Sequence, residues 1–133
     1  MALLIGVLLA IAVGLFATGV GLDRDRAFYP AVVIVVASYY VLFAVMGAPA
    51  RTLVLELIAG VVFIAAAAAG FRMSLWIVVL ALAGHSVFDL THGAVIANAG
   101  VPFWWPQFCL SYDFTAAAYL AWLLKSKRVR AAA

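Results

Sequence analysis

Long apolar runs, broken only at short charged or proline-marked points, dominate this sequence. The first run, residues 2–22, holds no charged residue and ends at the segment Asp23-Arg24-Asp25-Arg26. Runs of this kind approach the roughly 20 residues that a helix needs to cross the hydrocarbon core of a bilayer. Of the 133 residues, 70% are hydrophobic and 10% are charged, whereas a soluble domain carries roughly 25% charged residues. A soluble globular domain and a disordered chain are therefore both excluded.

Five membrane-spanning helices are expected from these runs. Their approximate bounds are 2–22, 28–47, 52–70, 74–98 and 107–124. The runs are continuous and do not show the alternation of apolar and polar residues that is typical of β-barrel strands. The first run also lacks the basic segment of a cleaved signal peptide, so we interpret it as a retained helix. The fold class expected is all-α, with residues 1–133 forming one polytopic bundle of five transmembrane helices.

The distribution of Lys and Arg predicts the orientation of this bundle. If the C-terminus is cytoplasmic, one basic residue, Arg51, lies outside. The other basic residues then lie inside: Arg24, Arg26, Arg72, Lys125, Lys127, Arg128 and Arg130. Five spans place the N-terminus on the outer side. The formal charge of +3 comes from helix ends and a short tail, so we expect the lipid bilayer as a partner and no nucleic acid.

Five ionisable residues fall inside the expected spans. They are Glu56, His85, Asp89, His92 and Asp113. A charge in the hydrocarbon core costs at least about 2.5–3.5 kcal/mol, so such residues usually face the bundle interior and mark a function. The spacing of the three on the expected fourth helix puts them on one stripe. Counted from the expected helix ends, all five lie roughly 6–18 Å below the outer boundary, so we expect side chains from three helices to converge near the extracytoplasmic side.

The chemistry of these residues favours a divalent metal site. Imidazole and carboxylate groups together select Zn²⁺, Fe²⁺ or Mn²⁺. Asp89 and His92 lie three residues apart and can hold one ion, with Asp113 as the ligand from the next helix. His85 lies about 10.5 Å from His92 along the helix axis, so we expect it to support the site. Glu56 and Cys109 are further candidate ligands, and if the protein is an enzyme we expect a metal-dependent hydrolase or oxidoreductase acting on a lipid-like substrate.

Three other interpretations use the same features. In a purely structural network, Asp89 hydrogen-bonds His85, and Asp113 bonds Ser38, Tyr39 or Tyr40 on the second helix. In a proton or ion pathway, His85, Asp89 and Asp113 form a relay through the bundle. A structural subunit of a larger membrane complex, or a homo-oligomer, is the third. A stripe of small residues on the first helix allows it, although the same stripe serves ordinary packing within a bundle: Gly6, Ala10, Gly14 and Thr18.

The last two expected helices carry a pattern that resembles a family of small bacterial integral membrane proteins. The pattern consists of His-x3-Asp-x2-His at residues 85–92, Trp-Trp-Pro at residues 104–106 and Cys-x3-Asp at residues 109–113. The resemblance implies a small bundle in the bacterial inner membrane that holds this His/Asp set, and it implies no activity. A looser similarity links the chain to intramembrane zinc hydrolases such as the alkaline ceramidases and adiponectin receptors. Five spans and the lack of a His-x-x-x-His pair separate it from them, so their activity is not carried over.

Overall fold

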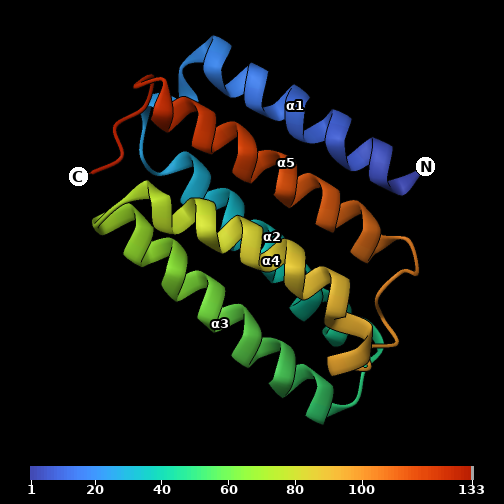
Figure 1. Ribbon diagram of the computed structural model, residues 1–133. Coiled ribbons are helices and arrows are strands. Elements are labelled where there is room, and N and C mark those ends of the chain that lie inside the picture. The colour runs from blue at the N-terminus through green and yellow to red at the C-terminus, as the bar shows by residue number, and fades with distance from the viewer. Residues whose placement is uncertain (133) are drawn as a thin grey trace.

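The computed structural model describes residues 1–132 as five long helices that run alternately up and down (Figure 1). The helices are α1 (Ala2–Val20), α2 (Phe28–Gly47), α3 (Ala50–Arg72), α4 (Leu75–Val95) and α5 (Trp105–Lys125), with a short 3-10 helix, η1 (Leu22–Arg24), after α1. The all-α fold with five helices is confirmed. Within the described residues, α1 to α4 are long and apolar enough to cross a membrane, consistent with a multi-pass membrane protein.

Helix α5 is less apolar than the other four because polar side chains occupy its first half. Ser111 and Asp113 are among them, and both are buried. The arrangement of the bundle explains how this is tolerated, since α5 lies between α1 and α4 (Figure 1). The composition expected of a membrane span is therefore met by α1 to α4 and not by α5.

The loop between α4 and α5 begins earlier than the sequence predicts. The expected fourth helix runs to residue 98, but α4 ends at Val95 and α5 begins at Trp105. Asn98 lies outside the helix, where its side chain donates to the Tyr40 carbonyl at 3.2 Å and to Glu56 at 2.8 Å. Pro106 fits the first turn of α5, where no backbone N–H has a partner inside the helix.

Helix α1 packs on α5 through the predicted stripe of small residues. Gly6, Ala10 and Gly14 are buried in this contact. A Cβ atom at Gly6 would overlap the backbone carbonyl of Phe108, so only glycine allows the two helices to approach this closely. The stripe thus serves packing within the bundle, as the simplest interpretation of the sequence expects.

The two ends of the bundle are closed differently. At the end that holds the C-terminal tail, the Arg26 guanidinium donates to the carbonyls of Phe71 and Ala131 at 3.0 and 2.8 Å. At the opposite end, the α4–α5 loop rests on the end of α2. A Cβ atom at Gly100 would overlap the carbonyl of Phe43, so glycine is required for the loop to sit there.

The half of the bundle nearest the tail is filled by apolar side chains. We call this set the apolar core, and it includes Val33, Ala67, Leu75, Val78, Leu82, Leu120 and Leu123. The buried ionisable residues of α3, α4 and α5 lie in the other half, toward the α4–α5 loop. The tail half also holds a smaller polar contact, in which the Thr18 hydroxyl meets the buried Asp23 and the Tyr119 hydroxyl, so the interior is polar mainly toward the α4–α5 loop.

Candidate metal centre

Helices α4 and α5 bring four ligand-type side chains together in the interior of the bundle. His85 and Asp89 lie one turn apart on α4, and Cys109 and Asp113 lie one turn apart on α5. All four are buried, and one ligand atom from each lies within 4.8 Å of the other three. We call them the ligand group. Spacing of one turn on two helices in contact is what places all four at the same level.

The contacts inside the ligand group centre on one carboxylate oxygen. Asp113 Oδ2 lies 2.6 Å from His85 Nδ1 and 3.7 Å from Cys109 Sγ. The same His85 nitrogen is 3.4 Å from Asp89 Oδ2. The other oxygen of Asp89 accepts a hydrogen bond from the hydroxyl of Tyr40 on α2 at 2.7 Å.

Three polar atoms of the ligand group have no hydrogen-bond partner in the described part of the chain. They are His85 Nε2, Asp89 Oδ2 and Asp113 Oδ1, and all are shielded from solvent. A buried polar atom without a partner is costly, and a buried unpaired carboxylate more so. Two carboxylates compete here for one imidazole, so the ligand group has more acceptors than donors. A cation bound among these atoms would correct the shortage.

His92 belongs to a second buried polar group. Its Nε2 lies 2.8 Å from Glu56 Oε1, and Asn98 Nδ2 donates to the same oxygen at 2.8 Å. We call Glu56, His92 and Asn98 the Glu56 triad. The His92 ring also stacks on Tyr40, with ring centroids 3.9 Å apart. Asp89 and His92, which the sequence pairs as ligands of one ion, therefore have different partners in the structure.

The sequence-based candidates are thus divided between two groups. His85, Asp89, Asp113 and the secondary candidate Cys109 lie in the ligand group, whereas His92 and Glu56 lie in the triad. Two residues that complete these groups have weaker signals in the sequence. Tyr40 is one of three polar residues on α2 that a structural network could use, but it binds Asp89 and not Asp113. Asn98 has no signal, because the sequence places it inside a helix.

The other two polar residues proposed for α2 serve different purposes. The Ser38 hydroxyl donates to the carbonyl of Ile34 in its own helix at 2.6 Å. The Tyr39 ring packs against Trp105, with ring centroids 4.7 Å apart. Tyr40 is therefore the residue through which α2 reaches the ligand group.

Compared with known proteins, the chain matches no protein-family model, no curated protein and no solved structure. The chemistry of these two buried groups is therefore the basis for assigning a function.

Proposed function

We propose that this chain is a multi-pass protein of the bacterial inner membrane whose ligand group binds one divalent transition-metal ion inside the bilayer. The observation that carries the proposal is the shortage of donors around two buried carboxylates. A metal ion supplies positive charge to several oxygen, nitrogen and sulfur atoms at once, so it is the cation that suits such a group.

In this proposal α5 is the fifth crossing of a single transmembrane domain. It has 21 residues, as α4 has, and its acidic side chain is buried rather than turned to lipid. The two termini lie at opposite ends of the bundle (Figure 1), as an odd number of crossings requires. The excess of basic residues in η1, the end of α3 and the tail favours a cytoplasmic C-terminus and an outer N-terminus.

The donor set favours Zn²⁺ or Fe²⁺ over Mn²⁺, because the Cys109 thiolate is a soft ligand. In a tetrahedral zinc site, neighbouring ligand atoms lie about 3.3–3.5 Å apart. The distances from His85 Nδ1 to Asp89 Oδ2 and from Cys109 Sγ to Asp113 Oδ2, 3.4 and 3.7 Å, are close to this spacing. The His85–Asp113 contact of 2.6 Å would have to lengthen by about 0.7 Å to reach it. A hydrolase or oxidoreductase acting on a lipid-like substrate would need one of the four positions open.

A proton or ion relay is the second candidate. It is favoured by the polar contacts that run from Tyr40 through Asp89 and His85 to Asp113. The apolar core argues against it, because a relay needs polar groups across the whole hydrocarbon layer and that half of the bundle is filled mainly by apolar side chains, with the contacts of Thr18 to Asp23 and Tyr119 among its few polar ones. Proton flux in proteoliposomes that depends on Asp89, and is lost in Asp89→Asn, would place this candidate first.

The test of metal binding uses two matched histidine substitutions. Protein purified in detergent should contain one zinc or iron atom per chain by elemental mass spectrometry. His85→Ala should contain almost none, whereas His92→Ala should keep the metal, because His92 is bound by Glu56. Circular dichroism and gel filtration verify that both variants are folded. Equal metal content in the two variants, or none in the parent protein, would overturn the proposal.

Cobalt substitution gives a second readout that needs no activity. Co²⁺ bound to a thiolate shows a ligand-to-metal charge-transfer band in the near ultraviolet. Cobalt-loaded parent protein should show this band, and Cys109→Ser should bind cobalt without it. Because Cys109 is the single cysteine of the chain, the band reports on this residue alone. A band unchanged in Cys109→Ser would place the cobalt elsewhere.

A further inference from the structure

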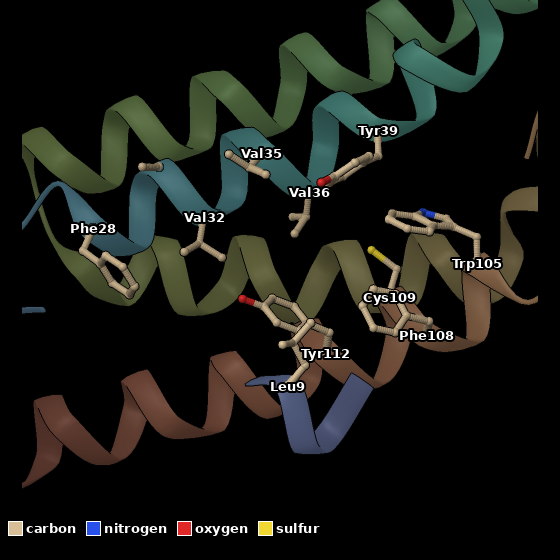
Figure 2. A pocket seen from close by; sticks show the side chains of 11 residues that line it. Leu9, Phe28, Val32, Val35, Val36, Tyr39, Trp105, Phe108, Cys109 and Tyr112 are labelled. Carbon is tan, nitrogen blue, oxygen red and sulfur yellow. The ribbon is translucent and has the colours of Figure 1, made fainter. Parts of the chain in front are cut away.

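A cavity of about 480 Å³ lies between α2 and α5, with α1 along one edge (Figure 2). It exists because α2 packs mainly on α3, while α5 packs on α1 and α4, so the middle parts of α2 and α5 stay apart. Its volume falls within the range of about 300–1,000 Å³ that is usual for small-molecule sites.

The medium next to this cavity is lipid. The cavity is lined entirely by side chains of α1, α2 and α5, and α1 and α2 are long and apolar enough to cross a membrane. One of its lining residues, Val35, is 53% exposed on the outer surface of the bundle. A molecule therefore enters from the side, out of the hydrocarbon layer.

The walls indicate an apolar chain as the occupant. Val32 and Val36 form the α2 wall, and the ring of Phe108 lies on the α5 side (Figure 2). Along α2 the lining extends from Phe28 to Tyr39, a distance of about 16 Å. This lining is mainly apolar and can bury a hydrocarbon chain, while the hydroxyl groups of Tyr39 and Tyr112 are polar atoms along it (Figure 2).

A further polar group lies at one end of the cavity. The indole of Trp105 lies there, and its buried Nε1 donor has no hydrogen-bond partner in the described residues, although Trp105 is 9% exposed. Cys109 lies beside it, and Figure 2 shows its sulfur pointing from α5 toward Val36 on α2. An N–H group without a partner needs an acceptor, so the group of the occupant that lies at this end is an oxygen acceptor.

Cys109 also connects the cavity to the ligand group. It is the member of the ligand group that lines the cavity, and its sulfur lies 3.7 Å from Asp113 Oδ2 on the other side. An acceptor oxygen next to Trp105 would thus lie one side chain away from the proposed metal position.

We propose that this cavity binds a long-chain carbonyl lipid, with the hydrocarbon chain along α2 and the carbonyl oxygen at Trp105 and Cys109. This lipid is the class of molecule that the cavity would present to the ligand group. The inference rests on the proposed function only where it assigns the metal a role in acting on that lipid. The cavity itself binds the lipid whether or not metal is present.

Photo-cross-linking distinguishes an occupant of the cavity from lipid that merely surrounds the protein. The probe is methyl hexadecanoate with a diazirine in the middle of its chain, added to protein in detergent with and without chelator. Adducts on Val36 and Tyr112, located by mass spectrometry, should saturate with probe concentration. Unlabelled methyl hexadecanoate should compete for these adducts much better than hexadecane does.

Two matched substitutions provide the controls. Val32→Phe fills the cavity and should abolish the saturable adducts. Val62 lies on the outer side of α3 and is 61% exposed, so Val62→Phe should leave the adducts unchanged. Trp105→Phe keeps the ring and loses the donor, so it should weaken competition by the ester about fivefold, the effect of one neutral hydrogen bond.

The outcomes separate this inference from the proposed function. Adducts that rise linearly with probe, or that persist in Val32→Phe, would overturn the lipid site even if the protein holds metal. Equal competition by ester and alkane would overturn the position of the carbonyl. Saturable adducts in a protein that binds no metal would support the lipid site and would overturn only the metal proposal.

Discussion

The ligand group and the Glu56 triad are built from the same kinds of side chain but differ in how their carboxylates are satisfied. In the triad, Glu56 Oε1 accepts from both His92 and Asn98, and Glu56 Oε2 is the one buried polar atom without a partner in the described residues. In the ligand group, two carboxylates share the single Nδ1 atom of His85, and three polar atoms have no partner. This difference shows that a buried contact between histidine and a carboxylate does not by itself indicate a cation site. A cation site is indicated where carboxylate acceptors outnumber the hydrogen-bond donors around them.

Tyr40 makes this comparison experimentally accessible because it touches both groups. Its hydroxyl donates to Asp89, while its ring stacks on His92. Substitutions in the two groups can therefore be compared within the same layer of the bundle, where they should have different effects on metal binding and stability.

The largest difference is expected for matched changes of carboxylate to amide. Asp113→Asn removes a buried charged ligand and should weaken metal affinity about 100-fold, the scale of breaking a buried charged contact. Glu56→Gln should change the affinity by less than about threefold, because Glu56 lies outside the ligand group. Competition with a fluorescent zinc chelator measures both. Similar losses in the two variants would show that the groups act as one site.

The second prediction concerns the stability of the protein without metal, where the Glu56 substitution should have a larger effect than the Asp113 substitution. Glu56→Ala leaves His92 and Asn98 without their shared acceptor, so the free energy of unfolding should fall by about 2 kcal/mol. Asp113→Asn relieves the competition for His85 and should not lower it. Unfolding in mixed SDS micelles with chelator present checks both variants. A larger loss in Asp113→Asn would mean that the ligand group is already satisfied without a cation.

A smaller effect is expected for the residue that links the groups. Tyr40→Phe removes the hydrogen bond that orients Asp89 and keeps the ring on His92, so metal affinity should fall about tenfold. Tyr39→Phe is the matched control, because Tyr39 packs on Trp105 and its hydroxyl makes no hydrogen bond to either group in the described residues. Titration with zinc gives both values, and a loss of equal size in the control would remove the proposed role of Tyr40.

The smallest effect is expected at Asn98. Asn98→Ala removes one neutral donor from Glu56 and one from the Tyr40 carbonyl, so the free energy of unfolding should fall by about 1 kcal/mol. Metal content should not change. Loss of metal in this variant would show that the triad positions the ligand group, which would make the separation of the two groups wrong.

Most of the fold can be predicted from the sequence because a chain this apolar must form long apolar helices. The apolar runs and the breaks at charged or proline-marked points give five helices within a few residues, and α2 covers residues 28–47 as expected. The exception is the end of α4. Asn98 continues an apolar run, and in the structure the segment after Val95 leaves the helix and makes tertiary contacts, those of Asn98 with Glu56 and the Tyr40 carbonyl and that of the Ala97 carbonyl with Thr52.

The site was predictable only as far as helix geometry reaches. Spacing on one helix correctly indicates that His85, Asp89 and His92 share a buried stripe, and all three are buried. Which residue each one meets depends on the rotation of the neighbouring helices about their axes. That rotation brings Glu56 to His92 and Cys109 with Asp113 to His85, and hydropathy and depth alone do not encode it.

The wholly helical lining of the α2–α5 cavity has a consequence for how this protein would sense its surroundings. With no loop residue in the lining, a ligand of the proposed lipid site would dissolve in the bilayer before it reached Cys109. Occupancy would then follow the partition coefficient of the molecule and its mole fraction among membrane lipids, rather than its aqueous concentration. Water-soluble compounds of the same head-group chemistry would be filtered out before recognition begins.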